Sequence, residues 1–345
     1  MRGHKSGLSI SVLLCLPSIL FAATLPEIPV RHCPIQAPSS ALRFAHSFLS
    51  WAEPLDNDLQ NATTVEARIS PNVKTKRQAV MPLYTIDTYM HIIADSASAS
   101  PSSSAYVTDL QIRAQFEYLA RAYTDASIGF RLIGYSRRTN DTWARNGDDF
   151  GMKTALRRGG YSTLNIYYQS RLQSAPGTPG IPAGSILLGY CSLPAAGVGA
   201  RTPAAAYVLD GCNILSGTMP GGSVFGYNRG GSTVHEVGHW NGLLHTFQGN
   251  SCGTRDYGDY VADTPQEATS TNGCPAMKDS CPYSGVAPGY DGSDGAANPY
   301  GAQGYSGPDP ISNFMDYSND ACYTGFTPGQ GARMLNIWQI YREGR

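Results

Sequence analysis

The sequence predicts a domain of mixed helices and strands with two unlike halves, and three observations predict it. Strand-like and helix-like segments alternate from residue 84 to residue 242. Residues 248–310 are instead rich in Gly, Pro, Asp, Asn and Ser and show little periodicity. A hydrophobic content of 41% over 345 residues allows a sizeable core and excludes a disordered or fibrous chain. We therefore expect one domain, or one domain of two lobes, once processed segments are removed.

The first 22 residues have the pattern of a signal peptide. Arg2, His4 and Lys5 precede a mostly apolar run, Leu8–Phe21, which ends in two alanines. A membrane anchor is the alternative, but the run has about 14 residues where a spanning helix needs about 20. We therefore predict a secreted, extracellular protein whose signal peptide is residues 1–22.

Residues 23–77 are expected to be a propeptide. They show little strand-like alternation and one plausible helix, Ser40–Trp51, and they end in a polar stretch with the dibasic pair Lys76-Arg77. An exposed dibasic pair in a polar linker is a usual processing site. The mature domain would then be residues 78–345. The alternative is an ordinary extension that stays attached.

The first elements of the mature domain follow from its hydrophobic pattern. Tyr84–Ala94 alternates apolar and polar residues as a strand does. Thr108 is a good helix N-cap, and a mostly helical apolar stripe follows it through Tyr123. Further strands are expected over Ile128–Tyr135, Leu164–Tyr168, Ser185–Tyr190 and Ala206–Leu209, with a short helix over Met152–Arg158. Strands and helices thus alternate through the N-terminal half.

The C-terminal half has fewer regular elements. Asp291–Pro310 is expected to be a long surface loop, and cysteine bridges or ions must supply much of the order around it. A final helix opens with Thr327-Pro328-Gly329-Gln330, which provides an N-cap, a first-turn proline and the Gln of a capping box.

The charge balance gives no sign of a highly charged partner. The chain has 25 Lys and Arg against 26 Asp and Glu, for a formal net charge of -1 at pH 7. No overall electrostatic argument then favours nucleic acid or an anionic membrane. We expect neither as a partner, so partners must be inferred from individual sites.

The cysteines and two sequons agree with secretion. Of eight cysteines, Cys15 lies in the signal peptide and Cys33 in the propeptide. The other six are Cys191, Cys212, Cys252, Cys274, Cys281 and Cys322. They suggest three disulfides, but six cysteines permit fifteen pairings. Asn61 and Asn140 each begin an Asn-x-Thr sequon and would accept glycans if exposed.

The segment Gly230–Phe247, GGSTVHEVGHWNGLLHTF, carries the chemistry. On a helix, His235 and His239 are four residues apart and project from one face, where two imidazoles can bind one zinc ion. Glu236 lies beside them. A carboxylate there can accept a hydrogen bond from a zinc-bound water, take its proton during attack on a carbonyl, and later donate it to the leaving amine.

His245 is the candidate for the third ligand of a catalytic zinc site, which leaves one position open. On an unbroken helix it would point about 120° away from the metal. Gly242 removes this difficulty, because glycine readily takes the left-handed conformation that ends helices. The alternative is an amphipathic helix whose histidines are core or surface groups. The HExxHxxGxxH spacing would arise by chance about once in a hundred thousand such chains, which favours the metal site.

These residues resemble the metzincin clan of zinc peptidases, and within it the pappalysin family, particularly its secreted fungal members. The motif continues as His245-Thr246-Phe247, and Ser312-Asn313-Phe314-Met315-Asp316-Tyr317 resembles the Met-turn of that clan. The resemblance implies that Met315 packs beneath the metal and that Tyr317 helps stabilise the transition state. Taken alone, Met315 would be read as an ordinary core methionine.

The resemblance narrows the fold to the α+β, zincin-like class. It implies a mixed five-stranded sheet and two long helices in an upper lobe, about 78–242. A cleft separates this from an irregular, disulfide-stapled lower lobe with a C-terminal helix, about 243–345. Ser185–Tyr190 would be the edge strand above the cleft, where a substrate pairs through its main chain. Ordinary sheet pairing is the alternative for that strand.

The resemblance also implies disulfides and a second metal. The implied pairs are Cys252–Cys281, Cys274–Cys322 and Cys191–Cys212. Asp259 and Asp263 lie where related enzymes hold Ca²⁺, although a solvated acidic loop explains them equally well.

Cys33 is the odd thiol of the precursor. Its thiolate could occupy the open zinc position and keep the enzyme latent until the propeptide is cleaved. The alternative is a free thiol in a disposable segment.

Two classes of function are compatible with these residues. The first is a zinc endopeptidase acting on protein or peptide substrates, with His235, His239 and His245 as ligands, Glu236 as general base and acid, and Tyr317 as oxyanion partner. The second is a secreted binding protein that keeps the zinc scaffold without cleaving. Glu236 argues for the enzyme, because a structural zinc site normally closes with a fourth protein ligand. The resemblance suggests assimilation of environmental protein, with selective cleavage of one protein as the alternative.

Overall fold

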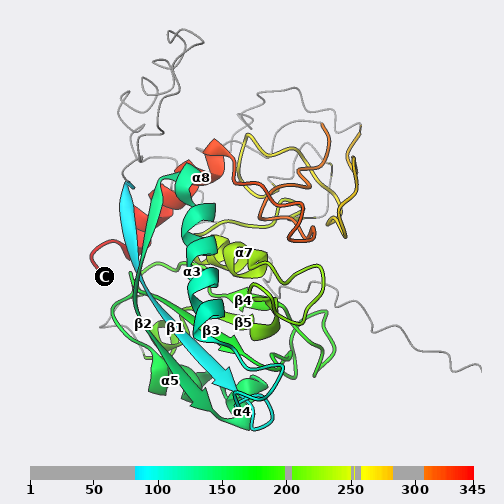
Figure 1. Ribbon diagram of the computed structural model, residues 1–345. Coiled ribbons are helices and arrows are strands. Elements are labelled where there is room, and N and C mark those ends of the chain that lie inside the picture. Colours follow the sequence, from blue (N-terminus) through cyan, green and yellow to red (C-terminus); the bar gives the residue numbers. More distant parts are fainter. Residues whose placement is uncertain (1–81, 199–203, 250–251, 253–257, 283–306) are drawn as a thin grey trace, which may run out of the picture.

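The structure is a computed structural model that describes residues 82–198, 204–249, 252, 258–282 and 307–345 (Figure 1). The predicted signal peptide, the propeptide with its helix Ser40–Trp51, Cys33 and Asn61 lie outside the described residues. So does most of the predicted loop Asp291–Pro310. Among the helices that are described, none has both the length and the apolar character that crossing a bilayer requires.

The described chain alternates strands and helices at first and is largely irregular after residue 240. The strands are β1 (Tyr84–Ala94), β2 (Ile128–Thr139), β3 (Leu164–Gln169), β4 (Gly189–Cys191) and β5 (Cys212–Leu215). The α-helices are α3 (Asp109–Ala122), α4 (Asp141–Ala144), α5 (Asp149–Leu156), α6 (Ala204–Val208), α7 (Gly231–Trp240) and α8 (Pro328–Ile337). Short 3-10 turns occupy Thr124–Ala126 and Ser216–Thr218, and a π-helical turn, Trp338–Arg342, continues α8.

The strands form one mixed five-stranded sheet in the order β2-β1-β3-β5-β4. Neighbouring strands from β2 to β5 run parallel, and β4 pairs antiparallel with β5. The mixed sheet of the α+β prediction is therefore present. β4 lies at one edge of the sheet, and it contacts α7.

The main core lies between the sheet and the helices α3 and α7 (Figure 1). Because side chains alternate along a strand, Met90 and Ile92 of β1 enter this core, whereas Ile93 points to the opposite face. There it packs with Met152 and Leu156 of α5. The two helices that the resemblance implies are thus on one face of the sheet, and α7 is buried along its whole length.

Both predicted N-caps are present, and each forms a capping box, although the box was predicted only for Thr327. Thr108 accepts a hydrogen bond from the Gln111 amide and begins α3, and Thr327 does the same with Gln330 at the start of α8. Pro328 occupies the first turn of α8. These helices begin where they do because a side-chain oxygen satisfies an amide that has no partner within the helix.

Several predicted boundaries were wrong, and one element was misassigned. Ala206–Leu209, predicted as a strand, lies largely in α6, and the strand follows it as Cys212–Leu215. All four residues of that strand are buried, so it has no alternating pattern to detect. Of Ser185–Tyr190, only Gly189 and Tyr190 belong to β4. The helix predicted over Met152–Arg158 begins earlier, because the Asp148 side chain caps it.

The remaining cysteines form three disulfides, Cys191–Cys212, Cys252–Cys281 and Cys274–Cys322. The first joins β4 to β5 at the sheet edge. The other two lie in the irregular lower lobe, where Cys274–Cys322 connects a loop to the segment that follows Met315. Covalent links therefore hold the part of the chain that has few regular elements.

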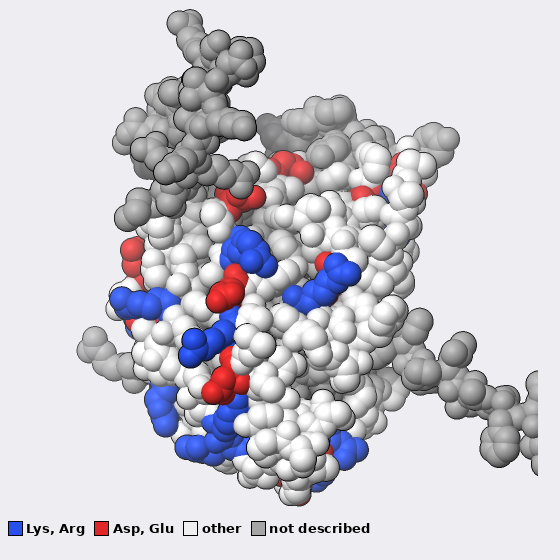
Figure 2. Space-filling view, in the orientation of Figure 1, with Lys and Arg blue, Asp and Glu red and all other residues white. Residues whose placement is uncertain are grey.

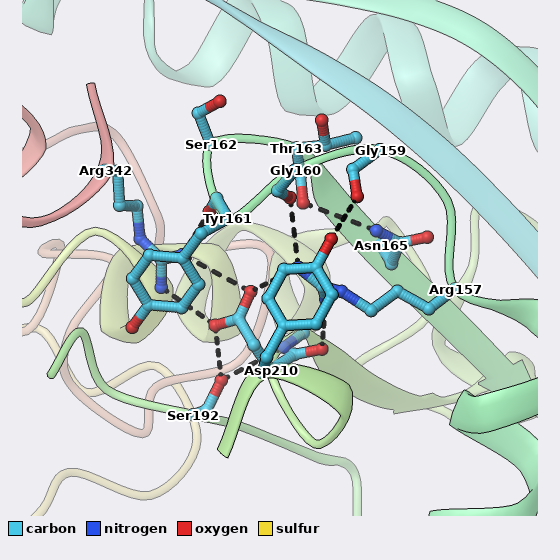
Figure 3. Close-up of polar contacts among 12 residues, drawn as sticks. Arg157, Gly159, Gly160, Tyr161, Ser162, Thr163, Asn165, Ser192, Asp210 and Arg342 are labelled. Carbon is cyan, nitrogen blue, oxygen red and sulfur yellow. Dashed lines mark hydrogen bonds and ion pairs between the residues drawn. The ribbon is translucent and has the colours of Figure 1, made fainter. Parts of the chain in front are cut away.

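A buried ionic cluster, whose Asp210, Arg157 and Arg342 are shown in Figure 3, anchors the C-terminal turn to the end of α7. Asp210 receives Arg342 at 3.0 Å and Arg157 at 3.3 Å, and all three side chains are nearly inaccessible to solvent. The Arg342 guanidinium stacks on Trp240, 3.5 Å from its ring centre, and donates to the Trp240 carbonyl. Although burial alone would raise the pKa of Asp210, Arg342 and Arg157 hold it below its usual value.

The exposed face of α3 carries charges of both signs. Figure 2 shows Lys and Arg side chains interspersed with Asp and Glu along this face. No large patch of one sign is visible over α3 in that view, in keeping with the formal net charge of -1.

Candidate metal centre

Helix α7 and the turn after it bring three histidines together. His235 and His239 lie one helical turn apart on α7. The helix ends at Trp240, and Gly242 has a φ of 92°, a left-handed conformation that side chains disfavour. The chain reverses there and returns His245 to the face that carries the other two. All three side chains are buried.

The three imidazoles point their Nε2 atoms at one another. The His239 Nε2 atom lies 3.1 Å from that of His235 and 3.2 Å from that of His245. Two of the rings have their Nδ1 atoms on carbonyls, His235 on Phe314 at 2.7 Å and His239 on Leu243 at 2.8 Å. Those carbonyls accept the ring protons at Nδ1, so the Nε2 lone pairs face inward.

This arrangement fits a zinc ion. An ion about 2.0–2.1 Å from two nitrogens that are this far apart would see them at about 100°, close to a tetrahedral angle. Converging lone pairs repel one another unless a cation lies between them. Among the described residues, His235, His239 and His245 are the group of His, Cys, Asp or Glu whose ligand atoms lie close enough together to hold a metal. Three neutral nitrogen ligands with no fourth protein ligand are typical of a catalytic zinc site.

Glu236 is buried between α7 and the edge strand. Its carboxyl group packs against Gly189 of β4: a Cβ atom built on Gly189 would lie 2.7 Å from the Glu236 Cγ and 3.0 Å from its Oε1. The position of the carboxylate therefore depends on the absence of a side chain at residue 189.

Met315 packs directly against α7. A Cβ atom on Gly238 would lie 2.5 Å from the Met315 sulfur, so the missing side chain at Gly238 is what admits the methionine. The Met315 carbonyl also accepts a hydrogen bond from the Thr246 amide at 3.2 Å. The segment that resembles a Met-turn thus contacts both the helix and the residue after His245.

Tyr317 stands against the histidine cluster. Its ring centre is 5.0 Å from that of His245 and 5.6 Å from that of His235. Phe247 packs on it edge to face at 4.7 Å. The Tyr227 hydroxyl donates to the Tyr317 carbonyl at 3.4 Å. The backbone of Tyr317 is therefore fixed from the segment that enters α7.

A buried carboxyl supports the turn after His245. Glu267 accepts a hydrogen bond from the Thr246 hydroxyl at 2.7 Å and forms an ion pair with Lys278 at 2.8 Å. Burial raises the pKa of Glu267 to about 7, and the nearby Asp316 adds to the rise. No sequence pattern indicated Glu267, because Lys278 and Thr246 lie 11 and 21 residues away from it.

The two aspartates considered for calcium have protein partners. Asp263 accepts from the Thr327 hydroxyl at 2.6 Å and from the Gly329 amide at 2.8 Å, which makes it a cap of α8. Asp259 accepts from the Val261 amide, and burial raises its pKa well above the usual value. Both aspartates thus have hydrogen-bond donors within the protein, and the calcium site stays a prediction. Asn140 caps α4 with its side-chain oxygen.

The chain matches a known family and several curated relatives. Residues 223–339 match the family model Peptidase_M43, described as pregnancy-associated plasma protein-A. An extracellular metalloprotease of Aspergillus oryzae is 44% identical over 290 residues, which cover 80% of this chain and 82% of that protein. One from Aspergillus fumigatus is 42% identical over 329 residues, covering 91% of this chain and 89% of the relative.

A solved structure shares the fold. A mutant of promirolysin from Tannerella forsythia superposes with a TM-score of 0.51 and 21% sequence identity, over 88% of this chain and 91% of that one. At that identity the likeness concerns the fold alone.

Proposed function

The chain belongs to the M43 peptidase family and is a metalloendopeptidase, and from this premise we propose that it is a secreted zinc enzyme in which Glu236 moves the protons of peptide hydrolysis. The single observation that carries the proposal is the convergence of three Nε2 atoms, two of them from α7, the helix that also carries the buried Glu236. The curated relatives are named extracellular, which supports secretion.

His235, His239 and His245 would hold the metal. Zinc, when bound, polarises a substrate carbonyl and makes water a better nucleophile at neutral pH. Glu236 takes a proton from the attacking water and gives it to the amine that leaves. Burial helps this role, because it excludes competing solvent and keeps the carboxylate in one place between α7 and Gly189.

Tyr317 is the proposed oxyanion partner. Its phenol can donate a hydrogen bond to the negative oxygen that develops as the carbonyl is attacked, and such a donor is worth about 100-fold or more in kcat. The ring already lies beside His235 and His245. The substrate would extend along β4, because an edge strand offers main-chain groups to a peptide and Gly189 stands over Glu236.

Hydrolysis of casein or gelatin by the secreted, processed protein tests the proposal. The Glu236→Gln variant is assayed beside the parent, and bound zinc is measured in both proteins. The parent should cleave, a chelator should stop it, and the variant should hold about one zinc per chain while cleaving little. If both hold zinc and neither cleaves any protein offered, a non-catalytic binding protein or a very selective protease replaces the proposal.

We also propose that residues 1–22 and 23–77 are removed during maturation and that Cys33 enforces latency. N-terminal sequencing of the secreted protein should find a start near residue 78. A Cys33→Ala precursor should cleave protein substrates before its own propeptide is removed. If that precursor stays as latent as the parent, the thiol has no such role.

A further inference from the structure

The active-site helix has no N-cap of its own. Gly230 holds the N-cap position with a φ of 100° and contributes no side-chain hydrogen bond. The first amides of a helix have no acceptor inside it and usually bond to a Ser, Thr, Asp or Asn at that position. The start of α7 is also buried, so solvent cannot substitute for a cap.

Asp320, far along the chain, supplies the missing acceptor. Its Oδ2 accepts hydrogen bonds from the Arg229 amide at 2.7 Å and the Gly231 amide at 3.2 Å. The approach depends on Gly231, where a Cβ atom would lie 2.5 Å from the Asp320 Oδ1. A carboxylate suits this place, because it accepts from two amides at once and carries the charge that a helix N-terminus favours.

Asp320 belongs to the same segment as Tyr317, three residues earlier. The Asp320 amide donates to the Gly226 carbonyl at 2.9 Å, and the Tyr227 hydroxyl reaches the Tyr317 carbonyl. The segment after Met315 is therefore attached at several points to the residues that enter α7. The carboxylate of Asp320 connects that segment to the helix that carries His235.

We propose that Asp320 is a positioning residue that sets the distance between Tyr317 and the zinc histidines. The inference rests on the proposed role of Tyr317. Helix α7 carries two of the ligands, while Tyr317 comes from the other lobe. The rate of peptide hydrolysis therefore depends on the relative position of the two lobes. Among the contacts between them, the Asp320 carboxylate bonds the start of α7 itself, three residues after Tyr317.

The chain offers a matched control in Asp263. This carboxylate also lies at a helix start: it accepts from the hydroxyl of Thr327, the N-cap of α8, and from the Gly329 amide. A Cβ atom on Gly329 would lie 2.5 Å from the Asp263 Oδ1, the same close approach as at Gly231. Helix α8 carries no residue of the histidine cluster. Loss of this cap should weaken the fold without altering the register of Tyr317.

The test is a double-mutant cycle with Asp320→Asn and Tyr317→Phe, in parallel with Asp263→Asn and Tyr317→Phe. We expect Asp320→Asn to lower kcat by about 10- to 100-fold, with KM and bound zinc little changed. In the Tyr317→Phe background the same change should cost almost nothing more, because its effect passes through the missing hydroxyl. Asp263→Asn should lower Tm and leave kcat within about two-fold in both backgrounds.

Hydrogen exchange gives a readout that does not depend on activity. Asp320→Asn should speed amide exchange at residues 226–232 and 313–322 together, whereas Asp263→Asn should speed it only near the start of α8. If Asp320→Asn does not fold, Gly231→Ala replaces it in the cycle, since its methyl displaces the same carboxylate.

Equal losses of kcat from Asp320→Asn with and without the Tyr317 hydroxyl would overturn the proposal, because Asp320 would then support only the helix. Unchanged exchange over 313–322 would overturn it as well. If the parent protein cleaves no substrate, the proposed function is wrong instead. The exchange data would still decide whether Asp320 holds residues 226–232 and 313–322 together.

Discussion

Adding one methyl group at Gly189 should disable the enzyme without removing its metal. Gly189 lies on the edge strand, and its φ is not in the positive range, so the backbone itself accepts alanine. The obstacle is Glu236. The new Cβ would lie 2.7 Å from the Glu236 Cγ and 3.0 Å from the carboxyl carbon, where ordinary contacts are 3.4–4 Å.

The expected cost follows from the displacement that the methyl group imposes. To restore ordinary contact, the Glu236 side chain or the strand must move by about 0.7 Å or more. A misplacement of about 1 Å at a reacting group can cost about 100-fold in rate. We therefore expect Gly189→Ala to lower kcat by about 10- to 100-fold, or about 1.4–2.7 kcal/mol of transition-state stabilisation.

The assay compares kcat and KM on a quenched fluorescent peptide for the parent, Gly189→Ala and Gly134→Ala. Gly134 is the matched control, because it lies in β2 and a Cβ there would meet only the Tyr89 ring, at 3.6 Å. The control should keep its kcat. Zinc content should be equal in all three, since the ligands come from α7 and the turn after it. A Gly189→Ala enzyme with the kcat of the parent would refute the argument that residue 189 fixes Glu236.

Three further outcomes follow from other contacts. Burial lowers the pKa of His91 to about 4, so folding favours the neutral imidazole. The free energy of unfolding should therefore be highest above pH 6.5 and should decrease by up to about 3 kcal/mol as the pH falls toward 4. Denaturant titrations of His91→Gln should show a smaller decrease over the same pH range. Asp210→Asn should reduce the free energy of unfolding by about 3–5 kcal/mol, because Arg342 stays buried without its carboxylate; a loss under 1 kcal/mol would contradict this. Gly238→Ala should lower Tm and kcat together, because its methyl meets the Met315 sulfur, and unchanged values of both would count against that packing.

Local patterns predicted the parts of the molecule whose causes are local. The alternation of Tyr84–Ala94 matches β1 to the residue, and the predicted N-caps Thr108 and Thr327 mark the starts of α3 and α8. His235, His239 and His245 were likewise found by spacing, because helix geometry and one glycine turn decide where they point. The family resemblance supplied Met315 and Tyr317, which spacing alone would not have singled out.

Sequence patterns did not predict the features that depend on contacts between residues far apart in the chain. The strand Cys212–Leu215 is buried on all sides and shows no alternation, so the pattern predicts a strand at the neighbouring Ala206–Leu209 instead. Asp320 caps a helix that begins 89 residues earlier, and Gly189 matters only because it packs on Glu236. Such contacts depend on how the sheet, α7 and the lower lobe pack together, which no short pattern reports.

The most direct test of the central claim is a zinc titration of the metal-free, processed protein with peptide cleavage followed at each step. The three converging histidines predict that cleavage rises in proportion to bound zinc and levels off at one ion per chain, and that Glu236→Gln binds the same ion while cleaving little. Full cleavage by the metal-free protein, or no loss of cleavage in Glu236→Gln at one zinc per chain, would contradict the account.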